Sequence, residues 1–352
     1  MAVRLALQAM VEQKRKLDPD EAVAALHEIF SGNATPAVTG AFLVALQQQE
    51  LDPALLRACA DEMVTFASPC AVPDPASLMD IVGTGGDGHD TFNVSSAAGI
   101  VMAAAGVRCA KHGNRSASGS VGTADFLEAL GCNLSLDGDQ VVKAIEECSF
   151  GFVFAPCFHP AMKHVGAIRK ELGVKTVFNY LGPLTNPARP SAQVIGVARR
   201  DLGPVFAEIF RLKGARCALI VHSAEGLDKI SPCGPTDCWL LKDGTVTEMR
   251  LAPEAFGVDT HPLEIVQGKD AGERAALFRD VLTPGCILSP AHLAFKDFLI
   301  ANAGAAIALS GKVAEADWKA GAAAARAVIE DGRAMATLDK YVAYSQACAK
   351  TA

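Results

Sequence analysis

The residue types best suited to chemistry gather at residues 80–125, where two polar loops each follow a short apolar segment. The first loop reads GTGGDG at residues 83–88, and the letters NVSS at residues 93–96 open an Ala-rich helix behind it. Clustered glycines let backbone N–H groups converge on an anion, and a helix N-terminus adds donors and a favourable dipole. We therefore predict a phosphate-binding centre, in which the Asp87 carboxylate would serve a metal ion or a sugar hydroxyl.

A tight turn followed by an N-capping serine is the alternative interpretation of the same glycines. The additional presence of Asp87 and of the Asn93-x-Ser95 pair favours the phosphate site. The loop is not a Walker A motif, because no Gly-Lys-Ser/Thr follows it.

The second loop, KHGNR at residues 111–115, concentrates side-chain donors and is followed by Ser116, Ser118 and Ser120. The chain has a formal net charge of −7, so a polyanion would need a local reversal of sign of this kind. A solvated basic loop is the alternative.

Three further polar residues stand near the ends of predicted strands or on the helix predicted at residues 160–173. Arg169 could hold a substrate carboxylate through two parallel hydrogen bonds, and Asp228 could hold a divalent cation against phosphates. The alternatives are a surface arginine, a loop-capping aspartate and, for His159, a capping or core histidine.

The elements that must position these residues fall into two groups. Residues 1 to about 70 predict helices with one buried stripe each, and the proline-rich residues 68–77 predict a domain junction. Short apolar strands then alternate with helices; the strands are predicted at residues 78–82, 107–111, 152–156, 176–179, 193–198 and 217–222. This alternation predicts an α/β domain with a mainly parallel sheet flanked by helices, with its ligand beyond the carboxyl ends of the strands.

Composition narrows the setting. The acidic charge argues against a nucleic-acid surface, and no apolar run of 18 residues predicts a membrane span. The first residues predict a helix and not a signal peptide. The 11 scattered cysteines predict thiols in a reducing, cytoplasmic setting, and the eight histidines show no zinc spacing.

Taken together, these features resemble the anthranilate phosphoribosyltransferase family over nearly the whole chain. The matching motifs are GTGGD at 83–87, NVSS at 93–96, KHGNR at 111–115, FHPAMKHVGAIRKELG at 158–173, FNYLGPLTNPA at 178–188 and GLDKIS at 226–231. The resemblance implies a helical domain of residues 1–72, joined by the helical segment 160–190, and an α/β domain of residues 73–352. It also implies a homodimer formed through the helical domain.

The family's reaction is the displacement of pyrophosphate from 5-phosphoribosyl 1-pyrophosphate (PRPP) by anthranilate, with Mg²⁺. The resemblance implies that the PRPP-binding residues are Gly83, Gly86, Asp87, Thr91, Asn93, Ser95, Ser96, Lys111, Ser118 and Thr123. The implied anthranilate-binding residues are Gly83, His112, Asn114, His159, Arg169 and Pro183. Ser95 and Asp228 would face Mg²⁺, and no side chain is expected to act as a dedicated nucleophile.

The chain departs from the family pattern at Lys229, where a glutamate is expected after Asp228. That glutamate helps to hold magnesium, so Lys229 could place an ammonium on the pyrophosphate or could weaken the enzyme. We expect a weaker and shifted Mg²⁺ dependence, which activity titrations of this chain and its Lys229→Glu variant would test.

Two other functions fit parts of the sequence. A pyrimidine nucleoside phosphorylase would have its own GTGG loop, but its continuation Val-Gly-Asp-Lys and its Lys-x-Ser-Gly-Arg segment are missing here. A nucleic-acid-binding homologue without transferase activity would need a basic stripe with interleaved aromatic residues, which the sequence lacks.

Overall fold

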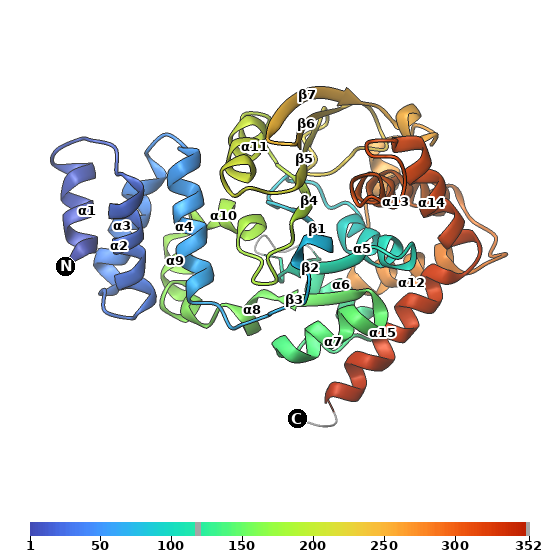
Figure 1. Ribbon diagram of the computed structural model, residues 1–352, viewed down its shortest axis with the longest axis horizontal. Helices are drawn as coiled ribbons and strands as arrows, with labels where there is room; N and C mark the ends of the chain where they lie inside the picture. Colours follow the sequence, from blue (N-terminus) through green and yellow to red (C-terminus); the bar gives the residue numbers. More distant parts are fainter. Residues whose placement is uncertain (117–120, 350–352) are drawn as a thin grey trace.

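Four helices form a bundle at the N-terminal end of the computed structural model, which describes residues 1–116 and 121–349 (Figure 1). They are α1 (Ala2–Val11), α2 (Pro19–Phe30), α3 (Pro36–Gln47) and α4 (Pro53–Thr65). Asp18 and Asp52 cap α2 and α4, because their carboxylates accept hydrogen bonds from backbone N–H groups in the first turn, at 2.9 and 2.8 Å. The predicted helical N-terminal domain is confirmed.

The rest of the chain is built on one sheet, which has seven strands within the described residues. Its strand order is β3-β2-β1-β4-β5-β6-β7. The strands are β1 (Leu78–Gly83), β2 (Arg108–Gly113), β3 (Phe150–Phe154), β4 (Ala192–Gly196), β5 (Cys217–Ser223), β6 (Thr236–Lys242) and β7 (Thr245–Leu251). Strands β1 to β5 run parallel to one another, and β6 and β7 add antiparallel pairs next to β5 at one edge. The mainly parallel sheet is confirmed, so the carboxyl ends of β1 to β5 share one edge.

Helices cover both faces of this sheet (Figure 1). Alternate strand residues point to opposite faces, so Ile81 joins the apolar core shared with α5 and α13, whereas Val82 joins the core shared with α11 and the helical bundle. The remaining helices of the α/β part are α5 (Val94–Ala104), α6 (Thr123–Ala129), α7 (Gly138–Cys148), α8 (Ala155–Phe158), α11 (Leu202–Leu212), α12 (Ala271–Leu282), α13 (Pro290–Leu309), α14 (Trp318–Glu330) and α15 (Arg333–Ala349). Short 3₁₀ helices occur at η1 (Pro75–Ser77), η4 (Pro253–Phe256) and η5 (Leu263–Val266).

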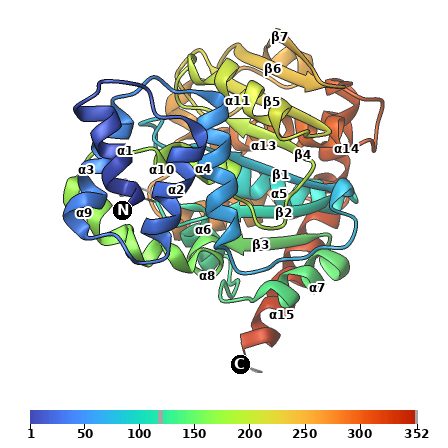
Figure 2. The same cartoon turned by 60° about the vertical axis from the view of Figure 1, so that its left-hand side comes forward.

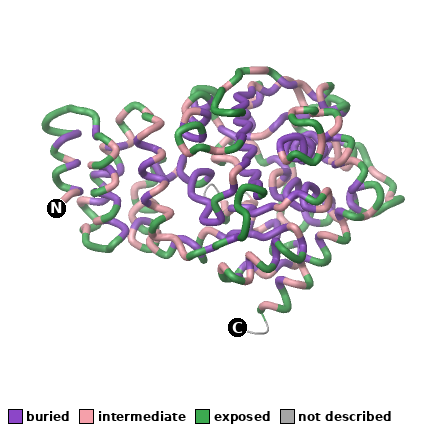
Figure 3. The backbone as a smooth tube through the Cα atoms, viewed as in Figure 1, coloured by how far each residue is buried: buried purple, intermediate pink, exposed green. Residues whose placement is uncertain are grey.

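Helix α13 is long and apolar enough, by length and composition, to cross a membrane. Its residues from Phe298 to Leu309 are nevertheless buried inside the α/β part, among residues drawn as buried in Figure 3. This is the environment of a central core helix.

Cys109 and Cys238 are also buried, and burial raises the pKa of both thiols.

The segment from residue 160 to residue 190 leaves the sheet and lies against the helical bundle (Figure 2). The single helix predicted at residues 160–173 is wrong, because Val165 divides it into η2 (Pro160–His164) and α9 (Gly166–Leu172). Helix α9 packs against α3, where Ile168 and Leu172 lie beside Gly40.

The strand predicted at residues 176–179 is also wrong, because this segment leads into α10 (Phe178–Leu181) and η3 (Gly182–Leu184). The Asn179 side chain accepts a hydrogen bond from the Thr176 N–H at 2.9 Å, which closes a turn. Phe178 meets Phe30 of the bundle edge to face, with ring centroids 6.0 Å apart. The β-branched and aromatic residues that suggested a strand therefore face the helical bundle instead.

Candidate active site

The first glycine loop leaves the carboxyl end of β1 and closes over the loop that follows β5. Gly83 and Gly196 are paired in register at the ends of β1 and β4. A Cβ atom on Gly83 would lie 2.2 Å from Asp228 Oδ2, and one on Gly196 would lie 1.6 Å from the Asp228 backbone oxygen. The Gly85 N–H donates to Asp228 Oδ2 at 2.8 Å. Because Gly83 and Gly196 lack side chains, Asp228 can approach closely and hold the loop through the Gly85 N–H.

The loop itself adopts the conformation that its glycines permit. Gly85, Gly86 and Gly88 have φ angles of 69°, 73° and 78°, in the left-handed region that other residues rarely occupy. The exposed Lys175 extends from the segment beside the helical bundle, and its Nζ lies 3.6 Å from the position that a Gly86 Cβ would occupy. The loop thus has an ammonium beside it that the sequence motifs do not indicate.

The start of α5 is tied to the second polar loop by side-chain hydrogen bonds. Asn93 donates from Nδ2 to the Val121 carbonyl at 2.8 Å, and the Ser96 hydroxyl lies 3.2 Å from that of Thr123. Ser95 is half-buried in the first turn of α5. The structure therefore brings these predicted residues together at one helix N-terminus. Ser118 lies outside the described residues.

Arg274 of α12 supports this helix start from below. It is 2 % exposed and donates to the carbonyl oxygens of Thr91 at 2.8 Å and Gly268 at 2.6 Å, and to Asn93 Oδ1 at 3.3 Å. Burial lowers the pKa of its guanidinium. Arg274 has no sequence motif around it, and only the tertiary structure reveals that it fixes the backbone preceding α5.

Asn302 of α13 holds the loop after β5 in a similar way. Its side-chain oxygen accepts a hydrogen bond from the Ile230 N–H at 3.2 Å, and its Nδ2 donates to the Ile230 carbonyl at 2.9 Å. Asn302 is 2 % exposed, so these bonds are shielded from water. The backbone next to Asp228 and Lys229 is therefore fixed by a core helix.

Lys229 forms ion pairs with two buried carboxylates of the site. Its Nζ lies 2.8 Å from Asp87 Oδ2 and also contacts Asp228 Oδ1. Burial raises the pKa of Asp228 although Lys229 opposes this; for Asp87 the Lys229 ammonium outweighs burial and lowers the pKa. Burial would lower the pKa of Lys229, but the two carboxylates outweigh it and raise that pKa. The ammonium is therefore charged at neutral pH.

Lys111 lies inside the sheet edge and not on an exposed loop. It is 2 % exposed, and its Nζ donates to the His112 carbonyl at 3.2 Å. Burial lowers its pKa, which the charge of Asp80 partly offsets. Asp80 accepts hydrogen bonds from the His112 N–H at 3.3 Å and from Asn186 Nδ2 at 3.0 Å. A buried lysine and a buried carboxylate thus support the second loop.

His112 and His159 form a neutral pair at the carboxyl ends of β2 and β3. His112 Nδ1 must donate to the Gly182 carbonyl, 3.1 Å away, because a carbonyl oxygen only accepts. Its Nε2 is then the acceptor for His159 Nε2 at 3.3 Å. Burial lowers the pKa of His112 to about 3, with a further contribution from His159, and lowers that of His159 to about 4.

The predicted acceptor side includes Arg169, Pro183 and Asn114. Arg169 is half-buried, lies 5.4 Å from the centroid of the Phe178 ring and donates to Asn179 Oδ1 at 3.5 Å. Within the described residues Arg169 forms no ion pair, so its guanidinium is available to a carboxylate. Pro183 is buried in η3, and Asn114 is exposed.

The donor-rich second loop suggests that Arg115 contributes to this site, but Arg115 points to α6 instead. Its guanidinium forms hydrogen-bonded ion pairs with Asp125 at 2.8 Å and with Glu128 at 2.6 Å. Both carboxylates belong to α6, so Arg115 serves to attach the loop to that helix.

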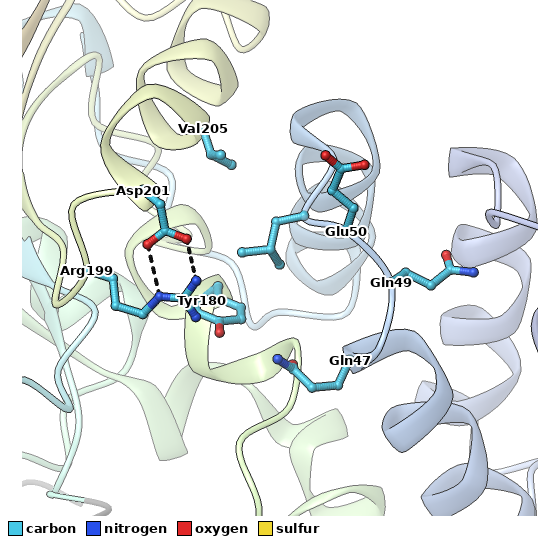
Figure 4. A pocket seen from close by; sticks show the side chains of 8 residues that line it. Gln47, Gln49, Glu50, Tyr180, Arg199, Asp201 and Val205 are labelled. Atoms are coloured by element: carbon cyan, nitrogen blue, oxygen red, sulfur yellow. Dashed lines mark hydrogen bonds and ion pairs between the residues drawn. The ribbon is translucent and has the colours of Figure 1, made fainter.

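A cavity of about 410 Å³ lies between the helical bundle and the start of α11 (Figure 4). It is lined by Gln47, Gln49, Glu50, Leu51, Tyr180, Arg199, Asp201 and Val205. Arg199 donates from Nε to Asp201 Oδ1 at 2.9 Å, so its charge is satisfied within the cavity wall. The described residues predicted for substrate binding do not line this cavity, so the candidate site is the one at the glycine loops.

Comparisons with known proteins cover almost the whole chain. The sequence profile described as "Glycosyl transferase family, a/b domain" matches residues 75–335, and "Glycosyl transferase family, helical bundle domain" matches residues 5–67. The anthranilate phosphoribosyltransferase of Nitrosomonas europaea is 41% identical over 342 residues, and that of Polynucleobacter asymbioticus is 43% identical over 341 residues. Each match covers 97% of both chains. The chain belongs to the anthranilate phosphoribosyltransferase family.

Solved structures of the anthranilate phosphoribosyltransferase family share this fold. The enzyme (TrpD) from Thermus thermophilus has a TM-score of 0.87 and 40% identity, with 98% of this chain and 99% of that chain covered. The enzyme from Saccharomyces cerevisiae in complex with PRPP and Mg has a TM-score of 0.88 and 28% identity, with 98% of both chains covered.

The start of α5 suits a divalent cation, whereas the carboxylates beside Lys229 do not. Mg²⁺ takes oxygen ligands and is usually held by one or two carboxylates together with substrate phosphates. Among the described residues, no group of three or more His, Cys, Asp or Glu side chains could hold a metal ion. The Ser95 hydroxyl suits a cation carried by a phosphate, whereas Lys229 already occupies the carboxylates of Asp87 and Asp228.

Proposed function

We propose that this chain transfers the phosphoribosyl group of PRPP to the amine of anthranilate, forming N-(5-phosphoribosyl)anthranilate and pyrophosphate in tryptophan biosynthesis. One observation carries the proposal. The glycine loop after β1, held by Asp228, lies at the same sheet edge as the neutral His112–His159 pair after β2 and β3. A loop suited to an anion thus shares an edge of the sheet with an uncharged histidine pair.

The donor would bind at the glycine loops and at the start of α5. The proposed PRPP-binding residues are Gly83, Gly86, Asp87, Thr91, Asn93, Ser95, Ser96, Lys111, Ser118 and Thr123. Backbone N–H groups of the loop and of α5 would face the phosphates, and Mg²⁺ at Ser95 would neutralise charge on the pyrophosphate. The complex of the yeast enzyme with PRPP and Mg supports PRPP and Mg²⁺ as ligands, because that enzyme has the same fold.

The acceptor would approach from the side of α9. Arg169 would bind the anthranilate carboxylate, and His112, His159, Asn114, Pro183 and Gly83 would surround the ring and amine. A neutral histidine pair suits an aromatic amine, because a charged pair would repel the cation-like ribosyl carbon. With the histidine pair neutral, the positive charge on the acceptor side comes from Arg169, which would face the anthranilate carboxylate.

The reaction needs no nucleophilic side chain. The amine nitrogen of anthranilate forms a bond to C1 of the ribose, the bond from C1 to the pyrophosphate oxygen breaks, and pyrophosphate leaves with the electron pair. The nitrogen then loses one proton. The amine is already nucleophilic, so positioning and charge stabilisation of the leaving group would supply the rate enhancement.

The chain would act as a cytoplasmic homodimer formed through the helical bundle. Leu5 of α1 is 56% exposed and Val44 of α3 is 39% exposed, and these neighbouring helices offer an apolar surface. Sedimentation velocity should give a dimer for the wild type and a monomer for a Leu5→Glu, Val44→Glu variant. Ile287→Glu, which alters an exposed residue outside the bundle, should remain a dimer.

Loss of anthranilate fluorescence tests the reaction directly. The purified chain, mixed with anthranilate, PRPP and Mg²⁺, should consume anthranilate only when PRPP is present. Phosphorolysis of a pyrimidine nucleoside would show a phosphorylase instead. DNA binding that weakens steeply with salt, without turnover, would show a nucleic-acid-binding protein.

A further inference from the structure

Lys229 places an ammonium where two loops of the site meet. It follows Asp228 in the loop after β5, and it reaches Asp87 in the glycine loop after β1. The side chains of Lys229, Asp87 and Asp228 are 14%, 8% and 5% exposed. Removing one partner from an ion pair this far from solvent is much more costly than removing one from a surface pair, because it leaves a buried charge without compensation.

All four oxygens of these two carboxylates already accept hydrogen bonds from the protein. Asp228 Oδ2 accepts the Gly85 N–H at 2.8 Å, and Asp228 Oδ1 accepts Lys229. Asp87 Oδ1 accepts the His89 N–H at 3.1 Å, and Asp87 Oδ2 accepts Lys229 at 2.8 Å. A divalent cation that bridged Asp87 Oδ2 and Asp228 Oδ1 would have to take the position that the ammonium already holds between them.

We propose that Lys229 is a built-in cation that takes the place of a metal ion between Asp87 and Asp228. The ammonium neutralises the two carboxylates and joins the glycine loop to the loop after β5. The glycine loop is therefore held in place without a bound metal ion. Mg²⁺ would be needed only as the ion that accompanies the pyrophosphate, and this last point rests on the proposed function.

Removing the ammonium gives a distinctive result. Without it, two buried carboxylates face each other, and their repulsion should lower the melting temperature in EDTA. A divalent cation can then relieve that repulsion, so the Lys229→Gln variant should recover stability when Mg²⁺ is added. Lys229→Glu adds a third carboxylate and should respond more strongly.

Thermal unfolding without substrate is the test, at Mg²⁺ concentrations from zero (EDTA) upwards. At about 100 times the Kd, Mg²⁺ should raise the Tm of Lys229→Gln or Lys229→Glu by about 4 °C and leave the wild type unchanged. Lys213→Gln is the matched control, because Lys213 forms a 2.6 Å ion pair with Asp61 away from the site. The control should lose stability without responding to Mg²⁺. Equal Mg²⁺ shifts in the wild type and the Lys229 variants would overturn the proposal.

A measurement on the wild type alone covers the case in which the variants do not fold. Electron paramagnetic resonance of Mn²⁺ mixed with the wild-type protein should show the free-ion signal until PRPP is added. Tight Mn²⁺ binding in the absence of PRPP would contradict the proposal. Both measurements of metal binding need no turnover, so they decide the role of Lys229 even if PRPP fails to bind and the proposed function fails.

Discussion

The substitution Gly196→Ala should disable the site while leaving the rest of the fold in place. Its Cβ would lie 1.6 Å from the Asp228 backbone oxygen, which would have to move about 1.8 Å to reach an ordinary contact of 3.4 Å. Asp228 would then lose its hydrogen bond from the Gly85 N–H. A misplacement of about 1 Å costs about 100-fold in rate, so we expect kcat/KM to fall by about 100-fold or more.

Stability needs its own measurement, because the added Cβ would clash with the Asp228 backbone and not with a flexible side chain. Forcing an extra methyl group into packed structure typically costs about 1–3 kcal/mol, and a clash with backbone should cost at least the upper end of that range. Stopped-flow or steady-state measurement of anthranilate consumption gives kcat/KM, and urea unfolding gives the free energy of unfolding. Gly166→Ala is the control, because its Cβ would meet no atom within 4 Å. Wild-type kcat/KM for Gly196→Ala would refute the claim that Asp228 needs this close approach.

Three further predictions concern the residues around the loops. Arg274→Lys should weaken PRPP binding and lower the free energy of unfolding by about 1–3 kcal/mol, since carbonyl groups near α5 lose donors; calorimetry and urea unfolding measure this. Arg169→Lys should raise the KM for anthranilate about tenfold and leave that for PRPP unchanged, whereas the exposed neighbour Lys170→Gln should alter neither. The pKa values of His112 and His159, about 3 and about 4, lie below the unfolded value of about 6.5, so the unfolded chain binds more protons and stability should fall as pH drops below about 6.5. For His112→Gln, the free energy of unfolding measured in urea should fall less steeply as pH drops below about 6.5. The same pH dependence as in the wild type would contradict the neutral pair.

Local signals in the sequence predicted the glycine loop after β1 and the helix start that follows it. The clustered glycines at residues 83–88, the polar start of α5 and the alternation of strands with helices all depend on short-range patterns. The spacing of Gly83, Gly85 and Gly88 also fits the G-x-G-x-x-G pattern, so spacing alone could not separate this loop from a dinucleotide site. What distinguishes this glycine loop is its contact with Asp228, which comes from the distant loop after β5.

The residues that the sequence did not indicate act through tertiary contacts. Arg274 and Asn302 belong to helices near the C-terminal end and look like ordinary α/β sequence, yet they hold the backbone around Asn93 and Ile230. Arg115 shows the opposite case. It resembled a ligand donor in the sequence, but α6 supplies carboxylates that satisfy it.

The edge hairpin had a signal that went unused. Strands β6 and β7 are joined by Asp243-Gly244, and both residues have positive φ angles, 49° and 73°. An Asp-Gly pair between two strands of alternating pattern predicts a tight turn of this kind. By contrast, no local pattern indicates that Lys229 lies against both Asp87 and Asp228, since the loop that contains Asp87 is more than 100 residues away.

The stoichiometry of the products decides whether this site performs the proposed transfer. The purified chain, PRPP, anthranilate and Mg²⁺ should yield pyrophosphate and N-(5-phosphoribosyl)anthranilate in equal amounts, and neither product should form when anthranilate is left out. Pyrophosphate release without anthranilate, or no product of either kind from a folded chain, would contradict the proposed function.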